Sequence, residues 1–474
     1  MIQGESLIDA SMISGEPFPI KKTSGDTVIG ATVSHGSFIM QAEHIGQETL
    51  LARIVHLVSE AQRSRAPIQK LADLIASYFV PAVMLAALMT FLIWGFFIPS
   101  PRLSLGLVNA IAVLIIACPC ALGLATPMSI MVGIGQGALS GLLIRDAEAL
   151  ELMAKVDTLL IDKTGTLTEG KPTLTKVICL SKESENEILQ IAASLEIASE
   201  HPLAAPIVTA AKAKNLSLLS VKNFKNVKGK GLVGEIEGIP AAIGNPKLFA
   251  DLHIDPSAAL ESSEEISKEA QIVFYLALNH KIIGILAMAD AIKKSTPEAI
   301  AMLHQDHIRI VMVTGDSTTA ATAIGKSLKL DEIVAEILPE DKYKIVQRLQ
   351  SEGHIVAMAG DGINDAPALA QADVGIAMGT GTDIAMESAE ITLIKGDLRG
   401  IARARRLSQD TTRNIKQNLC FAFIYNALGI PIAAGILYPA FGILLNPMIA
   451  SAAMVLSSVS VIINALRIQL RIRH

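Results

Sequence analysis

Three long stretches of the chain contain no Asp, Glu, Lys or Arg, and they constrain the fold more than any other feature. They cover residues 74–98, 103–144 and 417–466. Because a membrane-spanning helix needs about 20 consecutive apolar residues, the first two stretches each predict one span. The third is long enough for two spans, divided near Pro439 and Pro447. We therefore expect four transmembrane helices arranged as two hairpins.

The composition agrees with a membrane protein that also carries large soluble parts. Hydrophobic residues make up 51% of the 474 residues and charged residues only 18%, whereas soluble domains average about 25% charged residues. This excludes a wholly soluble or disordered chain. The net charge of -5 excludes a broadly basic nucleic-acid-binding protein, and four cysteines are too few for a disulfide scaffold at this length.

Basic residues predict the orientation in the membrane. The two expected turns, 99–102 and 437–446, hold one Arg and no basic residue, respectively. The opposite ends of the hairpins carry Arg403, Arg405, Arg406, Arg413, Lys416, Arg467, Arg471 and Arg473. Because Lys and Arg are enriched on the cytosolic side, we expect both termini and all soluble parts to be cytoplasmic. The expected location is a bacterial inner or plasma membrane, with lipid as a partner.

The soluble residues fall into two blocks with different patterns. In 1–70, short alternating apolar runs such as 27–33 are separated by Gly and Ser and predict strands. In 145–410, β-rich runs alternate with helix-like segments, which indicates a parallel α/β sheet. Part of this block has strands of its own and predicts an inserted domain. The expected division of the chain is 1–70, 71–144, 145–172, 173–288, 289–410 and 411–474.

Aspartates follow three of the predicted parallel strands. Asp162, Asp316 and Asp361 each come shortly after such a strand, and Asp365 lies a little further along the chain. Parallel strands bring their carboxyl ends to one edge of a sheet, where ligands bind. A carboxylate there can accept a phosphoryl group, and its neighbours can hold Mg²⁺ against that group. Lys342 is expected to screen the charge on the phosphate oxygens.

These motifs resemble one family. The sequence 162–168 (DKTGTLT), together with 314–316 (TGD) and 360–365 (GDGIND), resembles the P-type ATPases, over nearly the whole chain. The resemblance implies an α/β, haloacid-dehalogenase-like phosphorylation domain with an inserted α+β nucleotide-binding domain, a partial β-rich actuator domain and transmembrane α-helices. It also implies ATP and Mg²⁺ as cofactors, with Asp162 phosphorylated. The residues expected at the magnesium ion are Asp162, Thr164, Asp361 and Asp365.

Thr164 distinguishes this chain from phosphatases of the same fold. Those enzymes carry a second Asp two positions after the nucleophile, where this chain has Thr164. The aspartyl-phosphate should therefore persist until another domain hydrolyses it, which suits a pump. In the sequence 14–17 (SGEP), Glu16 corresponds to the actuator glutamate that positions water against the phosphoenzyme, with Ser in place of the family's Thr.

The resemblance also implies the nucleotide contacts. Those expected in the insert are Glu196, His201, Gly229, Gly231 and Asn245. Those expected in the phosphorylation domain are Thr314, Gly315, Asp316 and Asn364.

Cys118-Pro119-Cys120 lies in the middle of the second uncharged stretch. Residues two apart on a helix point to nearly opposite faces, because each residue turns the helix by about 100°. Pro119 removes a helical hydrogen bond and kinks the turn, so both sulfurs can converge on one ion. Irregular backbone at membrane depth is tolerated where it lines a site. The tripeptide resembles the transmembrane motif of heavy-metal P-type ATPases.

The ligand chemistry favours copper(I). Thiolate and thioether ligands suit Cu(I), and also Zn²⁺, but none of the three stretches holds the carboxylate that a divalent ion requires. In the family, zinc-type members carry a Lys and an Asp in the last two helices. The corresponding residues here are Tyr425, Asn426, Met454 and Ser458, a pattern that resembles the copper(I) subgroup. Silver(I) is expected to follow the same path, and a cytosolic copper chaperone is the expected donor.

The expected function is ATP-driven export of Cu(I) by a P-type ATPase. Two alternatives stay open: a zinc-, cadmium- or lead-type pump, and a truncated remnant that binds ATP and metal without transport. The second arises because family members normally have four further helices and the first half of the actuator domain ahead of these residues. We therefore expect the sequence to begin inside the actuator domain.

Overall fold

The computed structural model describes residues 1–9, 20–28, 32–43, 45–46, 49, 52, 64, 66–97, 102–197, 199, 204–227, 230–268, 271–338, 341–379 and 383–471. The chain forms two compact units. Unit 1 comprises Met1–Val156, Asp373–Gly379 and Met386–His474, and unit 2 comprises Asp157–Ala372 and Thr380–Ala385.

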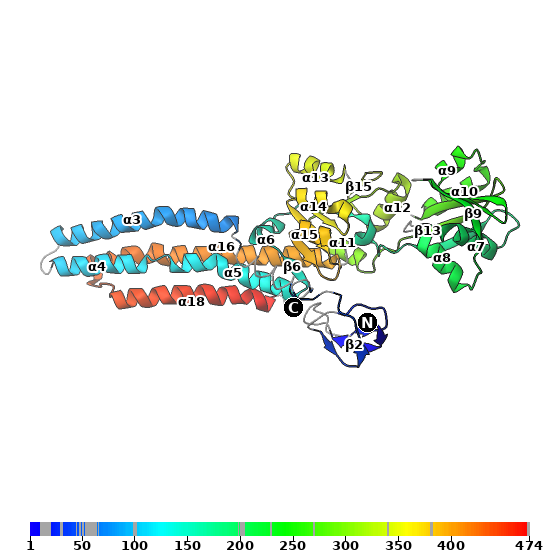
Figure 1. Ribbon diagram of the computed structural model, residues 1–474. Coiled ribbons are helices and arrows are strands. Elements are labelled where there is room, and N and C mark those ends of the chain that lie inside the picture. Colours follow the sequence, from blue (N-terminus) through cyan, green and yellow to red (C-terminus); the bar gives the residue numbers. More distant parts are fainter. Residues whose placement is uncertain are drawn as a thin grey trace. The chain divides into compact units, whose positions relative to one another are not determined.

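Unit 1 contains a bundle of long apolar helices that run side by side (Figure 1). They are α3 (Pro67–Phe97), α4 (Arg102–Ile116), α5 (Cys120–Leu139), α16 (Arg399–Ala433) and α18 (Pro447–Arg471). Among the described residues, three segments are long and apolar enough to cross a membrane, namely Pro67–Phe96, Leu103–Leu139 and Pro447–Gln469. These match three of the four predicted spans.

The fourth predicted span corresponds to the second half of α16. This helix begins in the charged segment at Arg399 and ends at Ala433, so its charge-free part, from Gln417 onward, is shorter than the other spans. It is not among the segments that satisfy length and hydropathy together. It nevertheless packs in the bundle, where a Cβ on Gly429 would meet the Ile116 side chain at 2.5 Å. The fourth span therefore stays a prediction.

Unit 1 also holds short strands and helices. Near the N-terminus, β1 (Gln3–Gly4) pairs with β5 (Phe38–Ile39), and β2 (Ser6–Asp9) lies between β3 (Ile20–Lys22) and β4 (Val33–Ser34). The predicted strand at 27–33 lies partly outside the described residues, and β4 begins only at Val33. The remaining elements are β6 (Leu142–Ile144), α6 (Ala147–Met153), β17 (Val374–Met378), β18 (Ile391–Leu393) and α17 (Tyr438–Phe441).

Unit 2 is built on parallel strands in the order β15–β14–β7–β16. Their bounds are Glu332–Val334, Arg309–Val313, Thr158–Asp162 and Val356–Gly360. The last three are almost entirely apolar and buried, as expected of parallel strands covered on both faces. The connecting elements are η2 (Lys163–Leu167), α11 (Thr296–Gln305), α12 (Thr318–Leu328), α13 (Lys342–Ser351), η4 (Ile363–Asp365) and α14 (Ala366–Gln371). α15 (Asp383–Ser388) follows β17 in the chain and extends from unit 2 into unit 1.

The predicted insert forms a six-stranded antiparallel sheet in the order β8–β13–β12–β11–β10–β9. These strands are Thr173–Cys179, Lys281–Ala289, Ile272–Leu278, Ile239–Gly244, Gly231–Ile236 and Val221–Val227. The helices are α7 (Glu185–Glu196), α8 (Ala204–Ala213), α9 (Pro246–Asp251) and α10 (Ser257–Lys268). Side chains of α7 and α8 share one buried cluster with the sheet, and those of α9 and α10 share another. This is the expected α+β insert.

Candidate functional site

The centre of unit 2 is Asp162, the last residue of the central strand β7. Asp162 is in register with Val313 of β14, and Ile161 is in register with Ala359 of β16. The segments that follow these two neighbouring strands therefore start at the same edge as Asp162. They carry Asp316 and Asp361, as the sequence predicts for adjacent parallel strands.

Three carboxylates converge at this edge. One oxygen from each of Asp162, Asp361 and Asp365 lies within 4.8 Å of the others. Carboxylate oxygens are the ligands that Mg²⁺ prefers, so the donor set fits this ion. Gly165 makes room for the cluster: its φ is +72°, and a Cβ there would meet Asp361 Oδ2 at 1.6 Å. No side chain can occupy that position without displacing Asp361.

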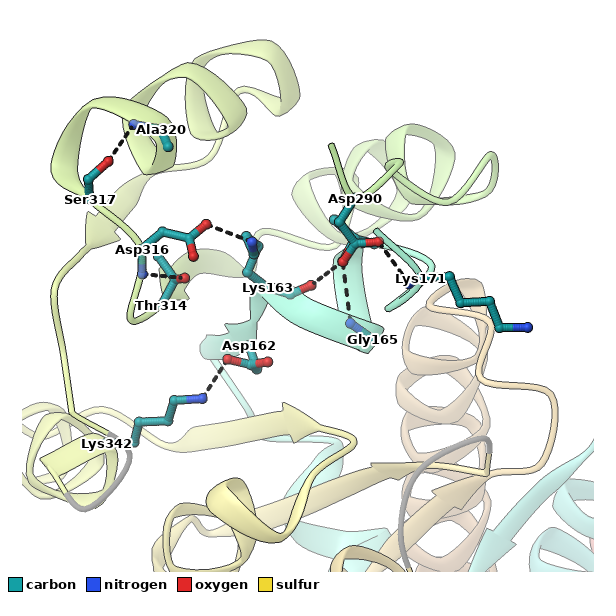
Figure 2. A network of polar contacts seen from close by, with 11 residues as sticks. Asp162, Lys163, Gly165, Lys171, Asp290, Thr314, Asp316, Ser317, Ala320 and Lys342 are labelled. Atoms are coloured by element: carbon teal, nitrogen blue, oxygen red, sulfur yellow. Dashed lines mark hydrogen bonds and ion pairs between the residues drawn. The ribbon is translucent and has the colours of Figure 1, made fainter. Parts of the chain in front are cut away.

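Lys342 joins this cluster from the first turn of α13. Its ammonium donates to Asp162 Oδ1 at 2.5 Å and to Asp365 Oδ1 at 2.6 Å, and all three side chains are nearly inaccessible to solvent. Figure 2 shows the Lys342–Asp162 contact. One cation therefore lies where excess negative charge gathers, while the role of Lys342 at the phosphate oxygens stays a prediction.

The pKa values reflect this crowding. Burial, followed by repulsion from Asp365, raises the pKa of Asp162 to about 6, although the Lys342 ammonium opposes the rise. Burial and Asp365 also raise the pKa of Asp361. Burial alone lowers the pKa of Lys342, but its two carboxylate partners raise it above the ordinary value. At neutral pH Asp162 is thus mostly ionised, while Lys342 is fully charged.

A second ion pair orients the loop that follows Asp162. Lys163, which is buried, donates to Asp316 Oδ2 at 2.6 Å, and the Asp316 backbone N–H donates to Thr314 Oγ1 at 3.1 Å (Figure 2). Thr314 and Asp316 therefore organise the loop through contacts with each other and with Lys163. Thr164 and Gly315 are exposed at the same edge, and Asn364 is exposed on the short helix η4.

Two residues that the sequence reasoning missed also support this loop. Asp290 Oδ2 accepts a hydrogen bond from Thr168 at 2.6 Å, and its Oδ1 accepts one from the Lys171 backbone N–H at 3.1 Å. Lys293 donates to the carbonyl oxygen of Gly165 at 2.5 Å. The sequence offers a pattern that could have identified them. Asp290 comes directly after the apolar run that forms β13, and Lys293 lies three residues further on.

Among the predicted nucleotide contacts in the insert, the structure describes Glu196, Gly231 and Asn245. Glu196 ends α7 and is buried. Burial raises its pKa to about 7, against a smaller opposing effect of the Ser199 hydroxyl. Its Oε2 has no hydrogen-bond partner in the described part of the chain. A buried carboxyl with one unused oxygen can accept a hydrogen bond from a ligand.

Gly231 and Asn245 have local structural roles of their own. A Cβ on Gly231 would meet the Ile243 carbonyl oxygen at 2.2 Å, so this glycine permits the close pairing of β10 with β11. The Asn245 side-chain oxygen accepts hydrogen bonds from the Lys247 and Leu248 backbone N–H groups and caps α9. Their contact with a nucleotide stays a prediction. Glu16, His201 and Gly229 lie outside the described residues.

In unit 1, the continuous apolar segment is interrupted at the predicted position. α4 ends at Ile116 and α5 begins at Cys120, with Pro119 as its N-cap. The break turns the two cysteines toward each other: Cys118 and Cys120 form a disulfide, with their Cα atoms 5.4 Å apart. Met454 of α18 approaches the same point, since its Sδ is 4.0 Å from Cys120 Sγ. Three sulfur atoms therefore gather in the bundle.

A small cavity adjoins these sulfurs. Cys118 and Ala121 line it from the α4–α5 break, Tyr425 and Asn426 from α16, and Met454 and Ser457 from α18. Of the residues predicted to bind Cu(I), all except Cys120 and Ser458 are on this lining. The Ser458 hydroxyl instead donates to the Met454 carbonyl oxygen at 3.4 Å. Ser457, one residue earlier, is the hydroxyl residue that the sequence reasoning missed.

Comparisons with known proteins identify the family of the chain. A family model described as haloacid dehalogenase-like hydrolase matches residues 156–373, and one for the P-type ATPase actuator domain matches residues 1–59. The crystal structure of a zinc-transporting PIB-type ATPase is similar over 99% of this chain and 75% of that chain, with 32% identity and a TM-score of 0.71. The chain belongs to the PIB-type ATPases.

Two curated relatives of this PIB-type chain show how much of a relative it covers. A copper-exporting P-type ATPase of Legionella pneumophila is 58% identical over 98% of this chain and 64% of the relative. A silver exporting P-type ATPase of Salmonella typhimurium is 52% identical over 99% of this chain and 57% of the relative. The chain thus spans less than two thirds of the length of either relative.

Proposed function

We propose that this protein is an ATP-driven exporter of Cu(I), and also of Ag(I), that works through an aspartyl-phosphate intermediate. The observation that carries the proposal is the arrangement around Asp162: a buried, largely ionised carboxylate with Lys342 and two further carboxylates at the edge of a parallel sheet. This is the constellation that phosphoryl transfer to a carboxylate requires.

In the proposed reaction, an Asp162 oxygen attacks the γ-phosphorus of ATP. The bond to the β-phosphate oxygen breaks, ADP leaves, and an acyl phosphate remains on Asp162. Lys342 contacts the attacking carboxylate and balances charge at this edge. The Lys163–Asp316 pair and the Lys293–Gly165 contact hold the loop after the nucleophile in place. Mg²⁺ bound by Asp162, Asp361 and the exposed Thr164, with Asp365 beside them, would neutralise phosphate charge.

The remaining predicted residues complete the cycle in this proposal. Glu196, with its unused oxygen, contacts the adenine together with His201, while Gly229, Gly231 and Asn245 shape the same surface. Thr314, Gly315 and Asn364 contact the nucleotide phosphates or ribose. Glu16 positions the water that hydrolyses the acyl phosphate, since Thr164 supplies no carboxylate beside Asp162. Hydrolysis releases inorganic phosphate and restores the free Asp162 carboxylate.

The cavity lining supports a soft monovalent cargo. Cys118, Met454 and the nearby Cys120 offer sulfur, and the lining contains no charged side chain. Reduced cysteines are required, because the thiolate is the metal ligand. One thiolate already balances the single charge of Cu(I), so no carboxylate is needed, whereas Zn²⁺ carries two charges and usually takes four ligands. Tyr425 and Asn426 provide polar contacts on the side of α16.

The charge distribution supports a proposed orientation in the membrane. The basic ends of α16 and α18 support a cytoplasmic location of the soluble parts, because Lys and Arg are enriched on the cytosolic side of membrane proteins. In this proposal the protein lies in a bacterial inner or plasma membrane, and a cytosolic chaperone hands over Cu(I). Metal then leaves on the opposite side of the membrane.

The test is phosphorylation of the full chain in reducing buffer with ATP labelled at the γ-phosphate. We expect an acid-stable, hydroxylamine-sensitive phosphoprotein whose formation depends on Cu(I) or Ag(I). Asp162→Asn should abolish it. Asp157→Asn is the matched control, because Asp157 immediately precedes the same strand and its nearest partners are Thr158 and His354. Copper-dependent phosphorylation of Asp162→Asn would refute the proposal.

Two further outcomes distinguish the alternatives. Phosphorylation stimulated by Zn²⁺ or Cd²⁺ and not by Cu(I) would assign the zinc-type function that the zinc-transporting structural relative suggests. Phosphorylation without copper uptake into sealed vesicles would identify a remnant that binds ATP and metal without moving the metal. Cu(I)-driven uptake that is lost in Cys118→Ala supports the proposed exporter.

A further inference from the structure

A second polar cavity, which the proposed cycle does not use, lies between α16 and α18. Asp410, Arg413, Asn414 and Gln417 line it from α16, and Asn464 and Arg467 line it from α18. It combines buried amide side chains with two arginines, which are donors suited to an anion.

The charge pattern of the sequence indicates the depth of this cavity relative to the membrane. Gln417 is the first residue of the third uncharged stretch, and Arg467 is the first residue after it. Arg413 lies about one helical turn before Gln417. Since the apolar stretch defines the hydrocarbon core, the two arginines lie at the level of the lipid headgroups.

The arginines give the cavity its charge. Arg413 and Arg467 are exposed, and in the described part of the chain neither is paired with a carboxylate. The recorded contact of Arg467 is a weak one, to Asn464 Oδ1 at 3.3 Å. Asp410 is the one acidic residue on the lining, so two guanidinium groups face one carboxylate. Guanidinium groups bind phosphate oxygens in pairs of parallel hydrogen bonds.

The back wall is a buried network that holds three helices together. Asn414 Nδ2 donates to the Asn464 carbonyl oxygen at 2.7 Å, and Asn464 Nδ2 donates to Asn418 Oδ1 at 2.8 Å. Ser129 of α5 donates to Asn414 Oδ1 at 2.8 Å and accepts from Asn418 Nδ2 at 3.1 Å. These four residues are at most 6% exposed. The wall is therefore rigid, and a ligand seated on it contacts both α16 and α18.

We propose that this cavity binds the phosphate group of an anionic lipid headgroup, with Arg413 and Arg467 as its donors. A lipid is favoured over a soluble phosphate because the cavity lies between two helices at the edge of the hydrocarbon core, where headgroups are the most abundant anions. Basic pockets between helices on the cytoplasmic side recognise such headgroups. The bound headgroup bridges α16 and α18 and stabilises the bundle that carries the sulfur cavity.

The experiment measures lipid binding to the purified full chain in detergent by native mass spectrometry, with thermal unfolding as a second readout. Phosphatidylglycerol is compared with zwitterionic phosphatidylcholine and with inorganic phosphate. We expect phosphatidylglycerol to bind about 10-fold more tightly than phosphatidylcholine and to raise the unfolding temperature. The double variant Arg413→Gln/Arg467→Gln should bind phosphatidylglycerol about 10-fold more weakly, and the lipid should no longer raise its unfolding temperature.

The matched control removes two positive charges outside the cavity. Arg403→Gln combined with Lys416→Gln changes two exposed residues of α16 that are not on the lining, and it should alter phosphatidylglycerol affinity less than 2-fold. Because all four side chains are exposed, unfolding of the lipid-free variants should match the parent. Equal loss in both double variants, or no preference for phosphatidylglycerol, would overturn the proposal. If millimolar inorganic phosphate displaces the lipid, the cavity is a site for a soluble anion, and the proposal of a lipid site is overturned.

Discussion

The ammonium of Lys342 is shared between Asp162 and Asp365, at 2.5 Å and 2.6 Å. The lysine thus bridges the proposed nucleophile and a residue of the proposed magnesium site. Two carboxylates of like charge are held together because one buried cation compensates both. This relationship leads directly to a test.

Lys342→Met should slow phosphoenzyme formation about 100-fold at neutral pH. The Lys342 cation lowers the pKa of Asp162, so its loss moves that pKa further above its value of about 6. Because only the ionised carboxylate attacks ATP, the acidic limb of the rate profile should begin near pH 6 in the parent and move to higher pH in the variant. Single-turnover phosphorylation between pH 5 and 8 measures this shift. Lys342→Arg keeps the positive charge, so the acidic limb of its pH–rate profile should match that of the parent. If this limb does not shift in Lys342→Met, Lys342 does not control the pKa of Asp162.

Gly165→Ala should strongly reduce phosphorylation without abolishing it, because its Cβ would overlap Asp361 Oδ2 and displace that carboxylate. Gly353→Ala is the control, since Gly353 also has a positive φ of +93° but has no atom within 4 Å of the added Cβ. The control isolates the cost of backbone strain, about 1 kcal/mol. We expect Gly165→Ala to cost more than the control in thermal unfolding and to raise the Mg²⁺ concentration needed for phosphorylation. Equal effects of the two variants would show that the Asp361 clash is relieved without consequence.

Glu196 should make nucleotide affinity depend on pH around 7. Burial raises the pKa of Glu196 to about 7, so the carboxyl is neutral below that pH and ionised above it. An ionised carboxylate accepts a stronger hydrogen bond from the adenine amino group. We therefore expect ATP affinity to rise several-fold from pH 6 to pH 8 in the parent. Fluorescent-nucleotide competition measures it.

Glu196→Gln provides the control for that prediction. Glutamine keeps an acceptor oxygen but does not titrate, so this variant should lose the additional pH dependence. Any pH effect from the ATP phosphates themselves persists in the variant and is subtracted. If ATP affinity rises equally with pH in the parent and in Glu196→Gln, Glu196 does not contact the nucleotide.

Ser457→Ala should weaken Cu(I) binding about 10-fold, whereas Ser458→Ala should change it less than 2-fold. Ser457 is buried and lines the sulfur cavity, where its hydroxyl can donate to a thiolate, and a hydrogen bond to a charged group contributes about 1.5 kcal/mol or more. Ser458 instead donates to the backbone of α18. Competition with a Cu(I) chelator under reducing conditions provides the affinities. The reverse order would assign Ser458 to the metal, as the resemblance to the copper(I) subgroup predicts.

Much of the site was predictable because it depends on local signals. The buried strands β7, β14 and β16 read as continuous β-rich runs, and Asp162, Asp316 and Asp361 follow them directly. The break at Pro119 was predictable because proline lacks the backbone N–H that a helix needs. Lys342 was predicted by its charge and the family resemblance, and the structure adds that it contacts two aspartates at once.

The remaining features depend on contacts between residues that are distant in sequence. Asp290 reaches Thr168 only because the insert returns the chain to the phosphorylation domain through β13. Whether Ser457 or Ser458 faces the cavity depends on the rotation of α18, and one residue changes that direction by about 100°. The length of the apolar part of α16 is set by where the helix ends, at Ala433, which a charge count does not reveal.

α16 also has a mechanical consequence. It is one uninterrupted helix from Arg399 to Ala433, and its internal proline, Pro431, lies beyond the cavity residues. Arg405 near its start donates to the carbonyl oxygen of Val156, the residue just ahead of the segment that leads into β7. Tyr425 lies about 30 Å further along the same rod. A twist imposed on the aqueous end near Arg405 therefore reorients the wall of the sulfur cavity, with no flexible joint in between to absorb it.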